Sequence, residues 1–232
     1  RSREQSKAQS TRSMLIDVLN RSASGFDRAV GRALFARSAR ARARSPSESL
    51  GHAERLESLA RIAARWDELE RDPRFFAAPC VTPELHLVRR ELGFDVVDAT
   101  WRSAFSPLDE GVRDRYGERR ENATAAARLF LHPEPRPAVV LIHGYRAGQY
   151  AVEERVWPLR WMLGHGLDVA LFVLPFHGVR ATPGRGPFFP ATDPRITNEG
   201  FRQAMIDLGA LTGHLRARGA PAVGVMGMSL GG

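Results

Sequence analysis

Cysteine is almost missing from this chain of 232 residues, which contains only Cys80. A single cysteine cannot form a disulfide within the chain, and scarce cysteine is typical of proteins in a reducing compartment. We therefore expect a cytoplasmic protein. Cys80 lies in a loop between Pro79 and Pro83, well before the predicted sheet, and we assign it no catalytic role.

Long apolar runs are missing as well. No stretch approaches the roughly 18 apolar residues of a membrane-spanning helix, and none near Arg1 matches the apolar core of about 7–15 residues in a signal peptide. Because the sequence begins with Arg1 rather than Met, we expect both ends to be cut. Metal-ligand spacings, phosphate-binding loops and nucleotide fingerprints are missing too, so we expect no metal and no cofactor.

The positive charge is confined to one end. Residues 1–45 contain 11 Lys and Arg against 3 Asp and Glu, an excess equal to the net charge of the whole chain, +8. The remainder is balanced, so nucleic acid is not an expected partner. Residues 14–36 have near-helical apolar spacing among arginines, within the basic segment at 14–44. This pattern favours a surface helix or a loose extension, and the alternative is peripheral contact with an anionic membrane.

The pattern divides the chain into three parts. Residues 1–47 are predicted to be a basic, partly disordered extension with helical character, ending in an Arg- and Ser-rich linker. Residues 48–90 are predicted to be a helical segment packed on the core, with Leu56 and Leu59 on its apolar face. Residues 91–232 are predicted to be the N-terminal portion of an incomplete α/β domain.

Short apolar runs alternate with helical patterns in this last part. Strands are predicted at 94–101, 124–131, 138–142, 168–174 and 222–226, and helices at 153–163 and 201–218. Pro158 inside the first helix indicates a kink or a late start. The alternation predicts an α/β fold with a mostly parallel sheet and flanking helices.

A candidate nucleophile follows the last predicted strand. Gly227-Met228-Ser229-Leu230-Gly231 is a G-x-S-x-G pattern, which in strand-turn-helix context marks a nucleophile elbow. A serine hydroxyl is a poor nucleophile unless it is presented to a base and a substrate together. Gly227 and Gly231 would remove β-carbons that collide where the strand and the following helix approach each other.

A second motif follows the strand at 138–142, namely His143-Gly144-Tyr145. With both motifs in this order, residues 94–232 resemble the α/β-hydrolase superfamily, whose members have a His-Gly turn after the third strand and the elbow after the fifth. The resemblance implies a partial α/β-hydrolase fold, with Ser229 as nucleophile and the backbone amides of Leu230 and Tyr145 as the oxyanion hole. His143 is then expected to organise the turn rather than to act as a base.

The resemblance also implies what the chain lacks. In this superfamily the acid and the histidine of the triad follow the serine, and only three residues follow Ser229. Asp193, Asp207, His177 and His214 precede it, so none is assigned to the triad. His177 is expected to be a structural loop histidine, with substrate contact as the alternative. The loop at 175–200 is expected to be either part of an acyl pocket or lid, or a connection packed on the sheet.

The leading functional hypothesis is a serine hydrolase that acts on carboxylic esters, with a small acyl compound as substrate, through an acyl-enzyme. The 232-residue chain is expected to be inactive because it lacks the acid and the histidine. Alternatives on the same fold are a peptidase, a thioesterase or an acyltransferase. A non-catalytic α/β-hydrolase-like binding protein is the alternative from another class. The sequence does not indicate an oligomeric state.

Overall fold

The computed structural model describes residues 51–69 and 76–232. The expected basic extension at 1–47, including the segment at 14–44 with its alternative of membrane contact, lies outside these residues. The helices are α2 (His52–Leu69), α3 (Glu110–Gly117), α4 (Tyr150–Val156), α5 (Leu159–Gly164) and α6 (Pro194–Ala217). The strands are β1 (Glu84–Glu91), β2 (Phe94–Arg102), β3 (Thr124–Leu131), β4 (Ala138–Ile142), β5 (Asp168–Phe172) and β6 (Val223–Gly227).

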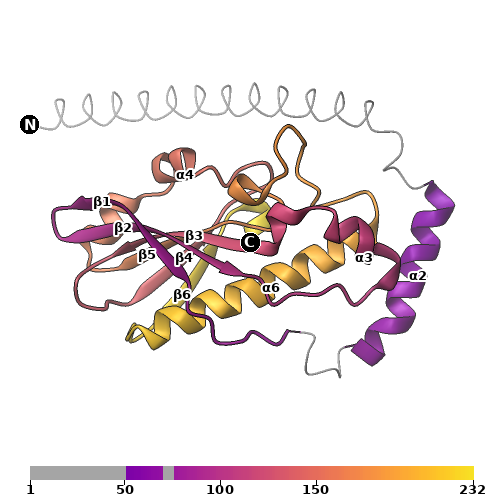
Figure 1. The fold of residues 1–232 in the computed structure, drawn as a ribbon, viewed down its shortest axis with the longest axis horizontal. Coiled ribbons are helices and arrows are strands. Elements are labelled where there is room, and N and C mark those ends of the chain that lie inside the picture. Colours follow the sequence, from indigo (N-terminus) through magenta and orange to yellow (C-terminus); the bar gives the residue numbers. More distant parts are fainter. Residues whose placement is uncertain (1–50, 70–75) are drawn as a thin grey trace, which may run out of the picture. The chain divides into compact units, whose positions relative to one another are not determined.

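The strands form one mixed sheet in the order β1-β2-β3-β5-β4-β6 (Figure 1). The pairings of β5 with β4 and of β4 with β6 are parallel, whereas β1, β2, β3 and β5 pair antiparallel along the sheet. The parallel character expected from the sequence is thus confined to β5, β4 and β6. Counted from β2, the His-Gly turn follows the third strand and the G-x-S-x-G segment follows the fifth. This order of strands and motifs is the one that the resemblance to the α/β-hydrolase superfamily leads us to expect.

Alternate residues of the central strands bury two different faces of the sheet. On β4, Val140 and Ile142 belong to a core that includes Leu211 and Leu215 of α6. Leu141 lies on the opposite face, in a second core to which Leu159, Met162 and Leu163 of α5 contribute. Helices therefore cover both faces, α6 on one and α4 with α5 on the other (Figure 1).

Strand β1 was not expected, because its residues fall within the segment predicted to be helical. It pairs with β2 through a tight turn at Gly93, whose φ is +95°. Almost all of its residues are exposed, as on an edge strand with neither face covered. The apolar alternation of Leu85 and Leu87 is broken at Val88, where the register shifts between Leu87 and Arg89. This bulge hides the two-residue period that predicts a strand.

Two helices differ from their predicted bounds. Pro158 divides the expected helix at 153–163 into α4 and α5, and it occupies the N-cap of the second. Helix α6 begins seven residues earlier than predicted, at Pro194, because the Asp193 side chain accepts a hydrogen bond from the Arg195 N–H and Pro194 suits the first turn.

Apolar side chains of both α6 and α2 lie exposed. Phe201 and Met205 of α6 are 47% and 52% exposed, and the helix instead buries Gln203 and Asp207. Leu56 and Leu59 of α2 are 54% and 49% exposed, so neither side chain is buried in the core.

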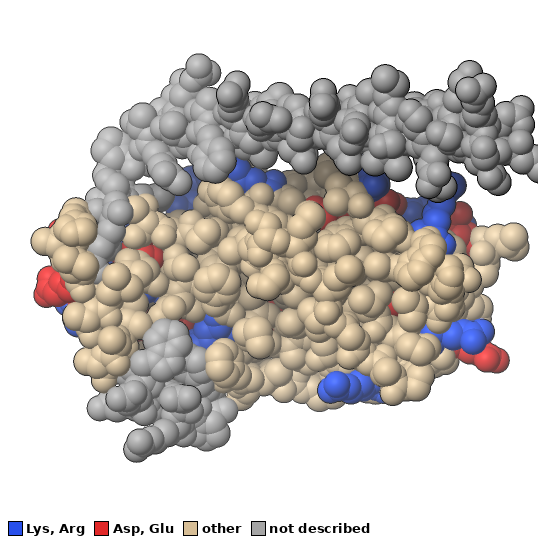
Figure 2. All heavy atoms as spheres, turned by 180° about the vertical axis from the view of Figure 1, so that it is seen from behind, with Lys and Arg blue, Asp and Glu red and all other residues tan. Residues whose placement is uncertain are grey.

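The described surface seen from behind carries its charged side chains mainly near the margins, and its middle is largely uncharged (Figure 2). The basic residues visible there do not form a continuous area on the described part of that face. None of the described helices is both long enough and apolar enough to span a bilayer.

Candidate active site at the carboxyl edge of the parallel strands

Three loops leave the sheet at one edge. In the parallel ladder, Ile142 at the end of β4 lies beside Phe172 at the end of β5 and Gly227 at the end of β6. The loop after β4 carries the His-Gly motif, and the turn after β6 carries Ser229. The carboxyl edge of parallel strands is where ligands bind in open α/β sheets. The two motifs, 86 positions apart in the sequence, therefore meet at one place.

Backbone strain gathers in the same three loops. Within residues 51–69 and 76–232, the non-glycine residues with positive φ are Arg146 (62°), Phe176 (61°) and Ser229 (56°), one in each loop. A side chain in this left-handed region costs free energy, and such residues persist only where their surroundings fix them. Their grouping at one edge of the sheet indicates that this edge is shaped as a functional site.

Ser229 lies directly against the loop after β4. A β-carbon placed on Gly144 would be 3.4 Å from the Ser229 Cβ and 3.9 Å from its hydroxyl oxygen. The Met228 N–H donates to the Ile142 carbonyl at 3.0 Å, which ties the two turns together. Ser229 is exposed and begins a short 3-10 turn, η4 (Ser229–Gly231). Its hydroxyl is therefore presented to solvent beside Gly144.

The two glycines of the pattern occupy positions where no side chain fits. A β-carbon on Gly227 would lie 1.9 Å from the Gly231 carbonyl oxygen. One on Gly231 would lie 2.4 Å from the Ile142 oxygen and 2.8 Å from the His143 oxygen. Because these are backbone atoms, a side chain at either position must push η4 away from the ends of β4 and β6.

His143 is buried and both of its ring nitrogens are engaged. Nδ1 lies 2.7 Å from the Gly144 carbonyl oxygen, and Nε2 lies 3.1 Å from the Leu174 nitrogen. Since the carbonyl accepts and the Leu174 N–H donates, the ring is neutral with its proton on Nδ1. Burial also lowers the pKa of His143. This geometry joins the loops after β4 and β5, and it leaves no nitrogen free to take a proton from Ser229.

The two residues whose amides are expected in the oxyanion hole lie on different elements. Leu230 follows it in η4, and its partly buried side chain packs against two apolar cores. Tyr145 follows Gly144, and its side chain is 41% exposed. The Tyr145 ring meets the His177 ring edge-on, with centroids 6.0 Å apart.

A base for Ser229 is missing from the described part of the chain, where no hydrogen bond to its hydroxyl is found. Asp193 caps α6 and pairs with Arg195 and Arg115. Asp207 pairs with Arg180 at 2.8 Å, and both side chains are 1% exposed. These contacts account for the two aspartates that the sequence left outside the triad.

The loop at 175–200 is a packed connection rather than an open lid. Phe188 and Phe189 are buried with Phe176 in an apolar core that Leu230 also contacts. Arg180 anchors the loop from within, because it donates to the Val173 and Asn122 carbonyls as well as to Asp207. This buried ion pair was not expected from the sequence. A buried Arg and Asp far apart in the chain leave no local pattern.

His177 in this loop is 1% exposed, and its Nδ1 lies 2.8 Å from the Pro175 carbonyl oxygen. Its other nitrogen has no partner among the described residues. Burial lowers its pKa to about 4. A proton therefore binds His177 more readily in the unfolded chain than in the fold.

This difference predicts a loss of stability in acid. As pH falls from about 6.5 to about 4, His177 binds a proton in the unfolded state and not in the folded state, so its contribution to the free energy of unfolding should fall by about 2–3 kcal/mol between pH 7.5 and pH 4.5. Urea unfolding at pH 7.5 and pH 4.5 measures the drop, and His177→Gln should lessen it by about that amount. The same substitution at exposed His86 controls for the loss of an imidazole. An equal drop in wild type and His177→Gln would contradict the assignment.

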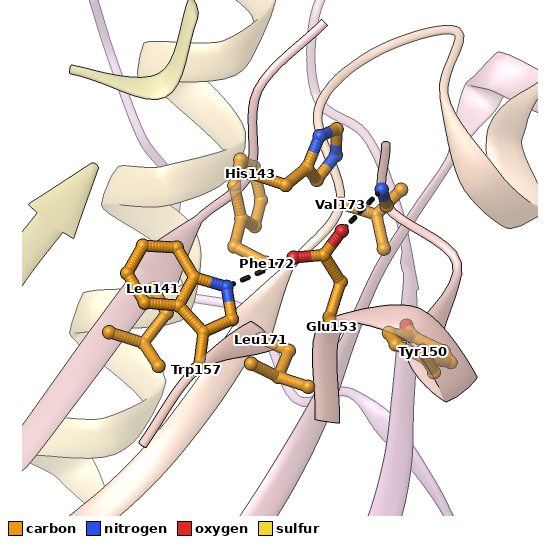
Figure 3. Close-up of a pocket in the computed structure, with 9 residues that line it drawn as sticks. Leu141, His143, Tyr150, Glu153, Trp157, Leu171, Phe172 and Val173 are labelled. Carbon is orange, nitrogen blue, oxygen red and sulfur yellow. Dashed lines mark hydrogen bonds between the residues drawn. The ribbon is translucent and has the colours of Figure 1, made fainter. Parts of the chain in front are cut away.

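Glu153 was missed by the sequence reasoning. Glu153 is 3% exposed, and its carboxylate accepts from the Gly148 N–H at 2.8 Å and from the Trp157 indole N–H at 2.9 Å. It lines a hollow beneath α4 together with His143 and Trp157, between α4 and strands β4 and β5 (Figure 3). The hollow is too narrow to admit a water molecule, so it is not a substrate pocket.

Comparison with known proteins gives relatives without an assigned activity. No family model matches the chain. It is 31% identical over 175 residues, 72% of this chain, to the uncharacterized protein Rv2627c of Mycobacterium tuberculosis strain ATCC 25618 / H37Rv. It is also 31% identical over 171 residues to the uncharacterized protein MT2702 of strain CDC 1551 / Oshkosh. The chain spans 41% of the length of each of these relatives.

Solved structures with partial likeness include a provisionally assigned acetyl xylan esterase of Bacteroides fragilis NCTC 9343. Its TM-score is 0.47 at 12% identity, over 75% of this chain and 48% of that one. Acetyl xylan esterase 1 of Thermoanaerobacterium sp. JW/SL YS485 has a TM-score of 0.43 at 18% identity, over 72% of this chain and 51% of that one.

Proposed function

We propose that the full-length protein is a serine hydrolase that acts on carboxylic esters. One observation carries the proposal: Ser229 stands in the left-handed region directly after β6 and touches the His-Gly loop after β4. A serine held in this way has its hydroxyl lifted out of the sheet at the edge where ligands bind. In a turn with only a structural role, glycine would adopt this backbone conformation at a lower cost in free energy than serine does.

In the proposed reaction the Ser229 oxygen attacks the acyl carbon of the ester. A histidine takes the hydroxyl proton and passes it to the departing alkoxide, and an acidic residue holds the histidine in place. The Leu230 and Tyr145 amides donate to the oxygen of the tetrahedral intermediate. Water then attacks the acyl-enzyme and releases the acid. We assign the histidine and the acid to a part of the protein outside residues 1–232.

Labelling by a fluorophosphonate tests the proposal. The full-length protein should react at one serine, and peptide mapping should place the added mass on the peptide that contains Ser229. Labelling of another serine would move the nucleophile. Absence of labelling, with no acid and histidine after the elbow, would favour the non-catalytic alternative.

A panel of acyl substrates separates the enzymes that share this mechanism. Oxygen esters, thioesters and amides of one short acyl group differ only in the leaving group, and we expect the highest kcat/KM for the oxygen esters. A preference for amides or thioesters would favour a peptidase or a thioesterase. Product formation that requires an added alcohol would favour an acyltransferase.

A further inference from the structure

We propose that Glu153 is a positioning residue for the oxyanion hole, holding the loop at 143–149 so that the Tyr145 amide faces the reacting carbonyl; this inference rests on the function proposed above. Glu153 itself touches neither Ser229 nor the expected place of the substrate. It acts through Gly148, to whose N–H it is bonded at 2.8 Å.

The loop must be held because its backbone is strained at Arg146, a non-glycine residue with φ 62° in the left-handed region. Gly148 also has a positive φ, 94°, a conformation that glycine adopts without strain. Gly148 is also closely packed, since a β-carbon there would lie 2.5 Å from the Nε2 of His143. The loop would relax to an ordinary conformation unless contacts at both of its ends fixed it.

Contacts fix both ends. At the start of the loop, the His143 ring bonds the Gly144 carbonyl and the Leu174 N–H. At its end, the Glu153 carboxylate receives the Gly148 N–H on one oxygen and the Trp157 indole N–H on the other (Figure 3). Tyr145 lies between these two fixed points, so the direction of its amide depends on both.

Burying the Glu153 side chain costs free energy, and a purely structural contact would not require a carboxylate at this place. Its side chain pairs with no cation in the described ranges, and two neutral donors hold it in place. The next residue, Glu154, serves a different purpose, since it pairs with Arg128 of β3 and Arg89 of β1 and thereby fastens α4 to the sheet. Of the two neighbouring carboxylates, only that of Glu153 contacts the loop beside Ser229.

The test compares Glu153→Ala, Glu153→Gln and Glu154→Gln in the full-length protein. For Glu153→Ala we expect kcat per titrated active site to fall by about 10²-fold with KM within about 3-fold, because a misplaced donor weakens transition-state binding. Glu153→Gln keeps one acceptor oxygen and should recover part of the loss. Glu154→Gln is the matched control and should retain kcat within about 3-fold.

Two further readouts separate a positioning role from a structural one. The rate of fluorophosphonate labelling should fall in Glu153→Ala while its end point is retained, because phosphonylation uses the same oxyanion hole. Amide exchange in the loop at 143–149 should quicken in Glu153→Ala and not in Glu154→Gln. A lowered Tm with kcat per active site and loop exchange unchanged would overturn this inference alone. Wild-type protein with neither labelling nor turnover would overturn the proposed function, and this inference with it.

Discussion

Replacing Ser229 by alanine in the full-length protein is expected to lower kcat for an ester substrate by at least about 10⁴-fold, because no other group can form the acyl-enzyme. The fold should persist, since Ser229 is exposed. Alanine also adds no atoms at the position where the backbone has φ 56°. Fluorophosphonate labelling should disappear together with turnover. Steady-state kinetics and labelling on the same preparations measure both effects.

Ser106→Ala is the matched control for this prediction. Ser106 is also exposed, and its backbone carbonyl, not its hydroxyl, accepts a hydrogen bond from Arg202. This variant should be labelled and active like the wild type. If Ser229→Ala retained turnover, the nucleophile would have to lie elsewhere and the assignment of the site would be wrong.

Replacing Gly231 by alanine is expected to lower kcat by about 10²-fold and to destabilise the fold by roughly 1–3 kcal/mol. The added β-carbon would lie 2.4 Å from the Ile142 oxygen and 2.8 Å from the His143 oxygen, and backbone atoms cannot turn away as a side chain can. The turn η4 must therefore move away from the end of β4, and Ser229 moves away from Gly144 with it. Urea unfolding and ester kinetics measure the two effects.

Gly224→Ala, on the strand β6 that leads into η4, provides the control. A β-carbon at Gly224 meets nothing within 4 Å, so this variant should change stability by no more than about 0.5 kcal/mol. Equal effects of the two substitutions would show that any side chain weakens β6, and that the contact between the two motifs is not the cause.

The sequence predicts those parts of the fold whose signal is local. The strand at 138–142 is a short apolar run that is buried on both faces, and the structure places β4 at the same residues. The meeting of the two motifs also follows from the sequence, because parallel strands end at one edge. Strand β1 was missed because the bulge at Val88 breaks its alternation.

The parts that were missed depend on partners distant in the chain. Asp207 of α6 looks like a residue of an exposed helix face, yet Arg180 makes it a buried one. Glu153 and Glu154 look alike in the sequence, as two charges on a short helix. One accepts from the loop after β4, whereas the other pairs with Arg128 and Arg89 on the sheet. Only the packing of α4 on the sheet distinguishes their roles.

The most direct measurement is the structure of the full-length protein after reaction with a phosphonate ester, because the adduct imitates the tetrahedral intermediate. The account predicts phosphorus bonded to the Ser229 oxygen, with the phosphonyl oxygen about 2.7–3.1 Å from the amide nitrogens of Leu230 and Tyr145. A phosphonyl oxygen that faces away from both amides, or an adduct on another residue, would contradict it.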